Sequence, residues 1–600
     1  MTQLLGEIDF DPDTLRKIYA RERDKRLRQD ANDQYIEVTA EFSNYVDDPF
    51  VEPGFHREPS SEDVDVVIIG AGFGGLLAGA HLRKAGLERI RLIERAGDVG
   101  GTWYWNRYPG VQCDVEAYIY LPLLEELGTM PTQRYAYGAE IFEHCKRMAK
   151  HFDLYEGALF QTDVTDLCWD ESGARWVVST DRGDRITAQF VVMATGPISR
   201  PKLPGIPGIN EFEGYTFHTA RWDYGYTGGD ASGNLTGLQD KRVGILGTGA
   251  TAVQCVPHLG RWANQLYVFQ RTPSSVDARH NSETDPNWAA SLEPGWQWRR
   301  IKNFDTIIAG GDPGFDLIAD GWSDIYRKLI DPESKIGRPL SDVERERLLE
   351  LSDFQKMEEL RARVDGIVTD PETAQRLKPW YRQYCKRPCF NDDYLETFNR
   401  ENVTLVDTDG RGVERFTRGA VVANGIEYEL DCLVFATGFE VGTGYFNRTG
   451  YETAGCGGLK LSQKWADGPH TFHGMQISGF PNFFMIGFLQ TALTFNVTHA
   501  FTEQARHIAY IIGELRERGA KAVEATSQAE RGWEGEMRAL SGQDTEYNLA
   551  CTPGYYNSEG DLDNPFGVNR VRYGAGPDRF FELLADWRGA RRLEGLELRE

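Results

Sequence analysis

The feature that most restricts the fold of this chain is a glycine-rich turn between a strand pattern and a helix pattern. Residues 64–69 read VDVVII, which predicts a buried parallel strand, and Gly70-Ala-Gly72-Phe-Gly-Gly75 follows directly. After a helix pattern, a second strand pattern, IRLIE, ends at Glu94, 24 residues beyond Gly70. Gly70 permits the tight turn, Gly72 lets the backbone approach a pyrophosphate, and Gly75 lets helix and strand pack closely. With Glu94 placed to accept from ribose hydroxyls, the unit predicts a dinucleotide site.

A second unit of the same kind begins with VGIL at residues 243–246. Its turn consists of Gly247, Thr248, Gly249, Ala250, Thr251 and Ala252, with alanine in the third glycine position. The residue 24 positions beyond Gly247 is Arg271, followed by Thr272, where the first unit has an acid. A carboxylate there would repel a 2′-phosphate, whereas a guanidinium binds it through paired charge-assisted hydrogen bonds. The second site is therefore predicted to take NADPH rather than NADH; the alternative is a solvated surface arginine.

Two nucleotide units with opposite preferences suggest a flavin that NADPH reduces. Two runs that end in Ala-Thr-Gly, at 190–196 and 432–438, read as strands that reach a bound cofactor and turn away on glycine. Six hundred residues exceed what one core usually supports, and 40% hydrophobic residues suffice for several. We predict an α/β fold with two Rossmann-like dinucleotide-binding domains, for FAD and NADP, plus a helical insertion and an N-terminal extension.

The predicted divisions are an N-terminal helical arm at 1–60, an FAD-binding domain at 61–196 and 431–600, an NADP-binding domain at 197–279 and 385–430, and the helical insertion at 280–384. The insertion carries an apolar stripe at helical spacing, formed by Leu348, Leu349, Leu351, Phe354, Met357 and Leu360. We expect this stripe to pack on its own domain rather than on a partner. The arm begins a helix at Asp11-Pro12, a capping residue and a first-turn proline.

The charge balance argues against polyanionic partners. The 66 Lys and Arg residues against 91 Asp and Glu residues leave a formal net charge of −25, which disfavours binding to nucleic acid or anionic lipid. No apolar run reaches membrane-spanning length, and the N-terminal residues resemble neither a signal peptide nor a transit peptide. We therefore expect a cytoplasmic protein with a small-molecule substrate, and its oligomeric state stays open.

The nine cysteines are scattered, without a CxxC pair or a zinc-ligand spacing. This distribution predicts no metal site and a reduced, intracellular chain. Cys385 and Cys389 could form a redox pair, but ordinary free thiols are the favoured interpretation.

A short stretch between the two units resembles a family signature. Residues 212–223 read FEGYTFHTARWD. The residues that match the pattern FxGxxxHxxxW, followed by Pro or Asp, are Phe212, Gly214, His218, Trp222 and Asp223. On this pattern the chain resembles the single-chain Baeyer–Villiger monooxygenases that use FAD and NADPH. The related N- and S-oxygenating flavin monooxygenases usually lack the tryptophan, so Trp222 favours the ketone-oxidising branch. An N- or S-oxygenating enzyme and a non-catalytic redox sensor that binds FAD and NADPH are the alternatives.

Further segments extend the resemblance over nearly the whole chain from about residue 62. The segments GGTWYWNRYPG at 100–110 and CDVEAYIY at 113–120 resemble the flavin-facing part of the family. The resemblance implies FAD contacts by Thr102, Trp103, Asp114, Tyr120 and Val164. The segment KRPCFNDDYLETFNR at 386–400 resembles the one that supplies the active-site arginine. That resemblance makes Arg387 the catalytic arginine and a neighbour of NADP, with Lys386 beside the NADPH phosphate.

The resemblance implies a reaction in which NADPH reduces FAD, the reduced flavin captures O₂ as a C4a-peroxide, and the peroxide adds to a ketone. One oxygen atom is thereby inserted beside the carbonyl, which gives a lactone or an ester. Arg387 stays charged at any working pH and would stabilise the anions of this reaction, while Asp114 would position it and partly neutralise it. His218, Trp222 and Asp223 are interpreted as a hinge clasp that couples cofactor state to domain position. Direct catalysis by His218 and plain packing are the alternatives.

Three stretches look most like enzymes that act on large-ring or polycyclic ketones: the arm that ends in YIEV, WDYGYTGGD after the signature, and CTPGYYNSEG at 551–560. Relatives with smaller substrates often carry a tryptophan near residue 551, where this chain has Gly554-Tyr555-Tyr556. The stretch LTFNVTH at 493–499 also differs from the best-known substrate loops. A macrocyclic ketone, a steroid and a terpenoid ketone of a secondary-metabolite pathway all remain candidate substrates.

Overall fold

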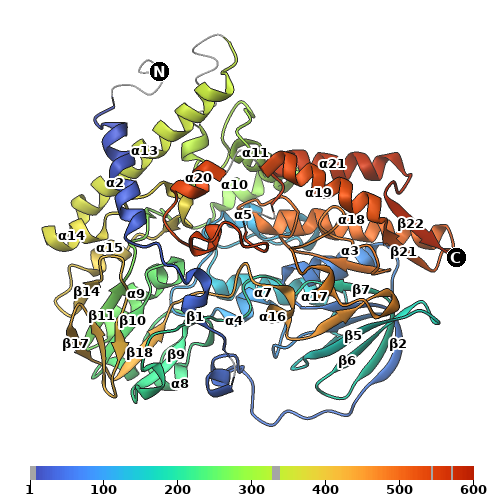
Figure 1. Cartoon of the computed structure of the whole chain (residues 1–600), viewed down its shortest axis with the longest axis horizontal. Coiled ribbons are helices and arrows are strands. Elements are labelled where there is room, and N and C mark those ends of the chain that lie inside the picture. Colours follow the sequence, from blue (N-terminus) through green and yellow to red (C-terminus); the bar gives the residue numbers. More distant parts are fainter. Residues whose placement is uncertain (1–7, 39, 328–337, 542–544, 569–571) are drawn as a thin grey trace.

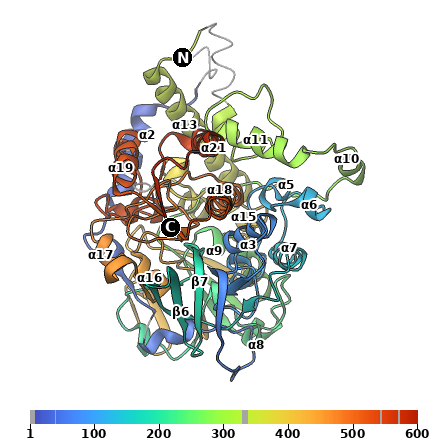
Figure 2. The same ribbon diagram turned by 90° about the vertical axis from the view of Figure 1, so that its right-hand side faces the viewer.

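Two β-sheets lie side by side, and a layer of helices covers one end of both (Figure 1). The computed structural model describes residues 8–38, 40–327, 338–541, 545–568 and 572–600. Figure 2 shows α18 (Val497–Glu517), α19 (Ser527–Ser541) and α21 (Gly576–Ala590) grouped above the first sheet. The C-terminal third of the chain therefore supplies much of the helical layer.

The first sheet forms around the turn at Gly70. Its strand order is β19-β5-β6-β7-β2-β3-β4, and β20 also pairs with β7. These strands are β2 (Ser61–Ile69), β3 (Ile90–Ile93), β4 (Ala158–Leu159), β5 (Val164–Asp170), β6 (Arg175–Thr180), β7 (Arg185–Met193), β19 (Glu452–Ala454) and β20 (Phe483–Met485). The central strand β2 runs parallel to β3 and β7, and Val66, Val67 and Ile68 are fully buried because both faces are covered. Helix α3 (Phe73–Lys84) follows the turn and packs against α18.

The second sheet forms around the turn at Gly247, and its five strands are all parallel. In order across the sheet they are β14 (Val403–Asp407), β11 (Gln265–Gln270), β10 (Arg242–Leu246), β18 (Cys432–Phe435) and β9 (Tyr215–His218). Helix α9 (Ala250–Trp262) follows the turn. The predicted boundary at residue 431 is wrong by one strand, because β18 pairs with β10 and β9 and so belongs to the NADP unit.

The insertion is helical, as predicted. Its helices are α10 (Pro286–Ala290), α11 (Trp296–Ile308), α13 (Asp342–Ile367) and α14 (Pro371–Leu377). Helix α13 starts with a capping box between Ser341 and Glu344. The predicted stripe residues on α13 are buried except Leu349, which is only partly buried. The stripe packs on helices of the same chain, α14 and α2 among them. Among the described residues, no helix combines the length and apolar character that a membrane span requires.

Short elements complete the fold. The helical ones are α4 (Thr102–Trp105), α5 (Ala117–Tyr120), α6 (Leu124–Leu127), α7 (Gly138–His151), α8 (Tyr224–Thr227), α15 (Tyr394–Thr397), α16 (Tyr445–Thr449), α17 (Leu461–Lys464), α20 (Thr545–Ala550), η2 (Ala40–Tyr45), η3 (Ile209–Glu211), η4 (Thr219–Arg221), η5 (Thr236–Leu238), η6 (Gln383–Cys385), η7 (Cys456–Gly458) and η8 (Tyr555–Gly560). The small strands are β12 (Val276–Asp277), β13 (Cys389–Phe390), β15 (Arg415–Phe416), β16 (Ala420–Ala423), β17 (Ile426–Glu429), β21 (Ala522–Ala525) and β22 (Leu596–Arg599).

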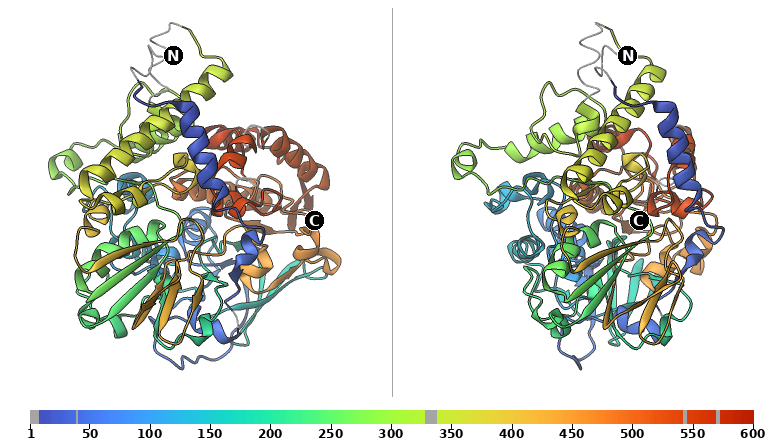
Figure 3. Two further views of the ribbon diagram at one scale, coloured as in Figure 1. Left: turned by 60° about the vertical axis from the view of Figure 1, so that its left-hand side comes forward. Right: turned by 90° about the vertical axis from the view of Figure 1, so that its left-hand side faces the viewer.

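The N-terminal arm crosses from the helical layer to the second unit (Figure 3). Helix α2 (Pro12–Asp24) is capped by Asp11 as predicted, and it crosses α13, where Arg16 forms an ion pair with Glu350 at 2.6 Å. The chain then forms η1 (Ala31–Gln34) and β1 (Tyr35–Ile36), which pairs with β8 (Leu203–Pro204). The end of the arm is thereby brought to the second nucleotide unit.

Candidate functional site

One cavity of about 910 Å³ extends between the two glycine-rich turns. Gly70 and Gly72 line one part of it, and Gly247 and Gly249 line another. Both Ala-Thr-Gly turns, at 194–196 and 436–438, also line the cavity. The two strands that end in these turns thus lead to the space that a cofactor would occupy.

The first turn has no room for side chains on Gly70 and Gly75, so its backbone stays open to close approach by a ligand. Gly70 has a φ of +101°, and a Cβ on it would lie 2.5 Å from the Ala194 carbonyl oxygen. A Cβ on Gly75 would lie 1.9 Å from the Gly70 carbonyl oxygen, so the helix can follow the turn only with glycine here. Glu94 is buried at the cavity, where its carboxylate accepts from the backbone N–H groups of Ala71 at 2.6 Å and Ala96 at 2.8 Å. Burial raises the pKa of Glu94, and the two amides act against that shift. This cradle fits the adenosine diphosphate half of FAD.

The residues expected to face the flavin come together with one exception. Thr102, Trp103, Asp114 and Tyr120 all line the cavity, and the Trp103 indole N–H donates to the Tyr120 hydroxyl at 3.0 Å. Val164 begins β5 and packs in the hydrophobic core of the first sheet, outside the cavity lining.

The second turn repeats the geometry of the first. Gly247 has a φ of +114°, and a Cβ on it would lie 2.5 Å from the Ala436 carbonyl oxygen. Gly249 caps α9 and faces open space, while the methyl group of Ala252 is accommodated in the core. The Thr248 hydroxyl donates to the Thr272 carbonyl at 2.7 Å, which ties the turn to the end of β11.

Arg271 is bound by segments that are remote in the sequence. Its side chain is 29% exposed, and it donates to Gln34 Oε1 at 2.5 Å and to Glu559 Oε2 at 3.1 Å. Arg26 of the arm donates to the Thr272 hydroxyl at 3.0 Å. The arm and a C-terminal segment therefore complete the group of polar side chains around Arg271, which we call the rim of the second unit. Sequence analysis assigns only Arg271, Thr272 and Lys386 to this rim. No local motif marks Arg26, Gln34 or Glu559, so sequence analysis missed them.

Two lysines add positive charge to this rim. Lys386 donates to the Pro553 carbonyl at 3.0 Å, and Lys202 lies 3.9 Å from a Glu559 carboxylate oxygen. Burial lowers the pKa of each lysine to about 8. A phosphate group would therefore meet arginine and lysine side chains together, which fits the 2′-phosphate of NADP.

Arg387 projects into the cavity between the two units. Its side chain is 40% exposed, its guanidinium lies 5.6 Å from the centroid of the Trp322 ring, and one nitrogen lies 3.3 Å from Asp114 Oδ2. Burial works against the charged form, but Asp114, Tyr555, Tyr556 and Cys389 together outweigh it and raise the pKa of Arg387. Arg387 is thus a permanent cation beside the space where a reacting carbonyl could lie.

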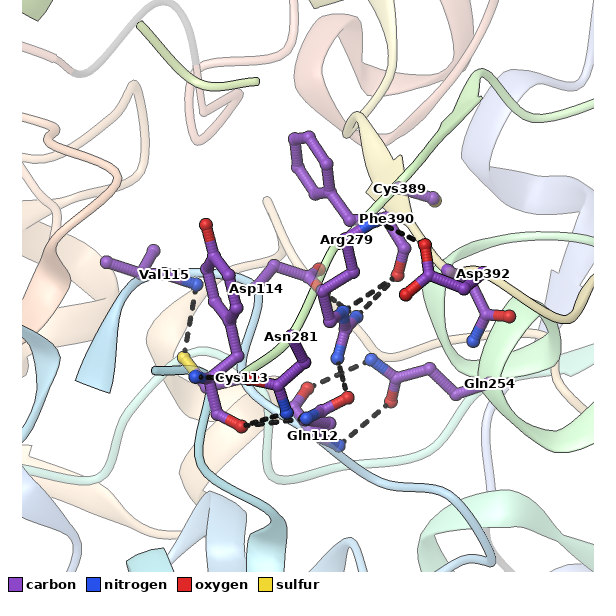
Figure 4. Close-up of polar contacts among 12 residues, drawn as sticks. Gln112, Cys113, Asp114, Val115, Gln254, Arg279, Asn281, Cys389, Phe390 and Asp392 are labelled. Carbon is purple, nitrogen blue, oxygen red and sulfur yellow. Dashed lines mark hydrogen bonds and ion pairs between the residues drawn. The ribbon is translucent and has the colours of Figure 1, made fainter. Parts of the chain in front are cut away.

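Asp114 is shared with a second arginine that the sequence did not identify (Figure 4). Arg279 is 3% exposed, binds the other carboxylate oxygen of Asp114, and also donates to Gln112 and to the Phe390 carbonyl at 2.5 Å. Because one carboxylate serves two guanidinium groups, the three side chains together carry a net positive charge, whereas a single Arg387–Asp114 pair would be neutral. Arg279 follows a nucleotide unit without a recognisable motif of its own, so only its contacts identify it.

The signature residues form a tightly packed clasp at the edge of the second sheet. Phe212 packs on Phe416, and a Cβ on Gly214 would lie 2.4 Å from the Phe212 ring. Trp222 is fully buried, and its indole donates to the Thr227 hydroxyl at 3.1 Å. Asp223 caps α8 by accepting from the Tyr226 N–H at 3.2 Å.

His218 lies at the end of β9, in register with Phe435 of β18. Its ring is fully buried and accepts from the Ala220 N–H at 3.1 Å. Burial, together with Arg221, lowers the pKa of His218 to about 3, so the ring is neutral at physiological pH. Next to it, the Arg221 guanidinium lies 3.7 Å from the ring centroid of Trp105, which lines the flavin-facing part of the cavity. The clasp therefore contacts both units, and His218 does not line the cavity.

Comparison with known proteins places this arrangement in a family. The family model of pyridine nucleotide-disulphide oxidoreductases matches residues 64–292. The Baeyer–Villiger monooxygenase ATR8 of Stachybotrys chlorohalonatus is 48% identical over 596 residues, which cover 99% of this chain and 95% of the relative. This chain belongs to the Baeyer–Villiger monooxygenases. Membership confirms the predicted reaction class and the predicted α/β fold of an FAD-dependent enzyme.

One further relative and two solved structures are also similar to this chain. Neopentalenolactone D synthase of Streptomyces avermitilis is 54% identical over 595 residues, which cover 98% of this chain and 100% of the relative. The polycyclic ketone monooxygenase of Thermothelomyces thermophila superposes with a TM-score of 0.90 at 37% identity, and the match covers 98% of each chain. A structure of OTEMO in complex with FAD and NADP superposes with a TM-score of 0.72 at 28% identity, over 90% of this chain and 100% of that one.

One prediction about the cysteines of this monooxygenase is wrong. Cys385 is bonded to Cys551 by a disulfide, and Cys389 is a free, buried thiol. The chain is therefore not fully reduced in this structure, and Cys385 pairs with a residue 166 positions away rather than with Cys389. The two segments meet because Gly554 packs against Lys386, with 3.2 Å between a Cβ built on Gly554 and the lysine nitrogen. Sequence spacing alone cannot reveal such a contact.

Aromatic side chains form the walls beside Arg387 in the monooxygenase. The Tyr384 and Phe495 rings stack at 5.4 Å between centroids, and Phe495 also lies 4.2 Å from the Trp322 ring. Tyr555 and Tyr556 line the same cavity. The stretch 493–499 contributes Leu493, Thr494, Phe495 and Val497 to the lining.

Proposed function

We propose that this monooxygenase uses NADPH and O₂ to insert one oxygen atom beside the carbonyl of a bulky polycyclic ketone of the terpenoid type, giving a lactone. The observation that carries the proposal is the aromatic wall around Arg387, built from the insertion, the segment before Arg387, the 493–499 stretch and the 551–560 segment. Aromatic walls suit a large apolar substrate, and one cation suits its carbonyl. The names of neopentalenolactone D synthase and the polycyclic ketone monooxygenase support the same substrate class.

Each unit has a proposed ligand. Gly70, Gly72 and Glu94 would hold FAD together with Thr102, Trp103 and Tyr120, and FAD, when bound, would supply the activation of O₂. Gly247, Thr248 and Gly249 would hold NADPH, and Arg271, Thr272 and Lys386 would bind its 2′-phosphate. Gly75, Ala252 and Val164 act through packing, because none of them lines the cavity.

Arg387 has the proposed role of stabilising negative charge that develops on the ketone oxygen. Guanidinium stays charged in this enclosed site, whereas a lysine could lose its proton. Asp114 and Arg279 would hold Arg387 in place without cancelling its charge. The aromatic walls would exclude water, which limits the unproductive release of hydrogen peroxide.

His218, Trp222 and Asp223 are proposed to transmit domain motion rather than protons. The burial and neutral state of His218 support this role over acid–base catalysis. His218→Ala should raise the share of NADPH consumption that ends in hydrogen peroxide. Unchanged coupling of NADPH oxidation to product would contradict the hinge role.

The substrate class is tested with FAD-loaded protein, NADPH and air. We would offer a tricyclic terpenoid ketone, a 20-keto steroid and cyclopentadecanone, and search by mass spectrometry for products with one added oxygen. Conversion of the tricyclic ketone at the highest kcat/KM supports the proposal. Conversion of only the macrocycle, or of the steroid in preference, would refute the terpenoid assignment.

A further inference from the structure

The cations of the second nucleotide unit already surround a carboxylate of the chain itself. Glu559 is 5% exposed and accepts from Arg271 at 3.1 Å and from the Tyr35 hydroxyl at 3.3 Å. The Lys202 nitrogen lies 3.9 Å from its other oxygen, above the Tyr35 ring. The Glu559 carboxylate thus occupies the place where these cationic side chains could otherwise bind a phosphate.

The electrostatics of Glu559 match this position. Burial alone would raise its pKa, but the attraction of Arg271, Lys202 and Lys386 outweighs burial and lowers the pKa. The carboxylate is therefore ionised at neutral pH. A buried carboxylate with several cations is stable where it lies, but a second anion at the same cations would repel it.

The backbone that carries Glu559 is strained. Ser558 and Glu559 have φ values of +52° and +58°, so two consecutive non-glycine residues adopt the left-handed conformation. This conformation is unfavourable for a residue with a Cβ and persists only where the surroundings hold it. Here the ion pair and the hydrogen bond from the Glu559 N–H to the Gly554 carbonyl at 2.8 Å hold it. The ion pair to Arg271 therefore helps to hold Glu559 in an unfavourable backbone conformation.

One end of this segment is fixed near the same site. The disulfide between Cys385 and Cys551 anchors it beside Lys386. At the other side, η8 packs against η1 of the N-terminal arm. Residues 554–560 are thus attached both at the disulfide and at the arm, beside the residues that would bind the nucleotide.

We propose that Glu559 is an internal counter-ion that the 2′-phosphate of NADP displaces from Arg271 and Lys202. The inference rests on the proposed use of NADPH at the second unit, and it adds an explanation of what sets the affinity of that unit for NADP. NADP brings a 2′-phosphate as a replacement charge for these cations, whereas NAD has only a ribose hydroxyl at the same position. Glu559 therefore lowers the affinity for NADP specifically, since part of the phosphate binding energy is used to displace the carboxylate.

Binding calorimetry on the FAD-loaded enzyme tests the proposal, with NADP⁺ and NAD⁺ titrated separately. Glu559→Gln keeps the size of the side chain but removes its charge, so NADP⁺ should bind about tenfold more tightly and NAD⁺ should change by less than about twofold. Tyr35→Phe removes one hydrogen bond to the carboxylate and should tighten NADP⁺ by a smaller factor. Combined with Glu559→Gln, it should add nothing, because both act on the same interaction.

The matched control is Glu530→Gln, which removes a buried carboxylate that pairs with Lys464 and does not line the cavity. It should leave both affinities unchanged. If Glu559→Gln weakens NADP⁺ binding, or changes it by less than about twofold, Glu559 only holds Arg271 in place and the proposal is overturned. If the wild-type enzyme binds no NADP⁺, the assignment of the second unit fails together with the inference.

Discussion

The two glycine-rich units share a backbone plan but differ in how the residue after the second strand is held. In the first unit, Glu94 is bound by the amides of Ala71 and Ala96, both within its own βαβ segment. In the second, Arg271 reaches Gln34 of the arm and Glu559 near the C-terminus. The first rim is therefore complete once its unit has folded, whereas the second depends on packing of distant segments. A preformed site suits a resident cofactor, and an assembled site suits a ligand that binds and leaves.

The largest expected effect comes from substitutions at the third glycine position of each turn, which is Gly75 in the first unit and Ala252 in the second. Gly75→Ala would place a methyl group 1.9 Å from the Gly70 carbonyl oxygen, so the first turn cannot form around it. We expect protein that purifies without FAD and loses more than about 3 kcal/mol of stability, as judged by flavin absorbance and thermal unfolding. The reciprocal change Ala252→Gly should cost only about 1 kcal/mol, because it removes a methyl group that the second unit accommodates. Equal tolerance of the two changes would contradict the comparison.

The next effect separates the ligands of the two rims. Arg271→Ala removes a charge-assisted contact worth about 1.5–3 kcal/mol, so NADP⁺ should bind some tenfold to a hundredfold more weakly. The FAD content should not change, since Arg271 does not belong to the first unit. Arg376→Ala, on an exposed arginine of α14, is the control. Loss of FAD from Arg271→Ala would show that the two sites are not independent.

A dependence on pH should appear at the second rim alone. Burial lowers the pKa of Lys202 and of Lys386 to about 8, so both lysines lose their protons as the pH rises through that value. Cations favour the phosphate, and the dissociation constant of NADP⁺ should therefore rise above pH 8, by up to about tenfold per pH unit for each group. Fluorescence titrations with NADP⁺ and NAD⁺ between neutral and alkaline pH would measure it. A parallel rise for NAD⁺ would indicate general unfolding instead.

The smallest effect concerns the arm. Arg26 is buried and donates to Thr272 at 3.0 Å, so Arg26→Ala should weaken NADP⁺ by a few-fold, equivalent to about 1 kcal/mol. Arg21→Ala, on an exposed side chain of α2 in the same arm, should change nothing. Equal NADP⁺ affinities for the two variants would show that Arg26 of the arm does not contribute to NADP⁺ binding.

The parts predicted correctly are those that follow from local spacing. Both βαβ units, the cap of α2 and the buried stripe on α13 obey short-range periodicity and turn chemistry. The boundary at residue 431 was misplaced because β18 reads the same in either sheet, and only its pairing with β9 and β10 assigns it. Val164 was placed at the flavin by resemblance, but its side chain packs into the core of the first sheet.

The two nucleotide units, the signature at 212–223 and Arg387 could all be found in the sequence, because the residues of each motif are close together in the chain and carry their own geometric requirements. Only the packing of distant segments makes Arg279 share Asp114, brings Glu559 and the arm to Arg271, and joins Cys385 to Cys551. These contacts join residues between about 160 and 290 positions apart. Such pairs meet only when whole elements pack, and their charges acquire a function only in the buried surroundings that this packing creates.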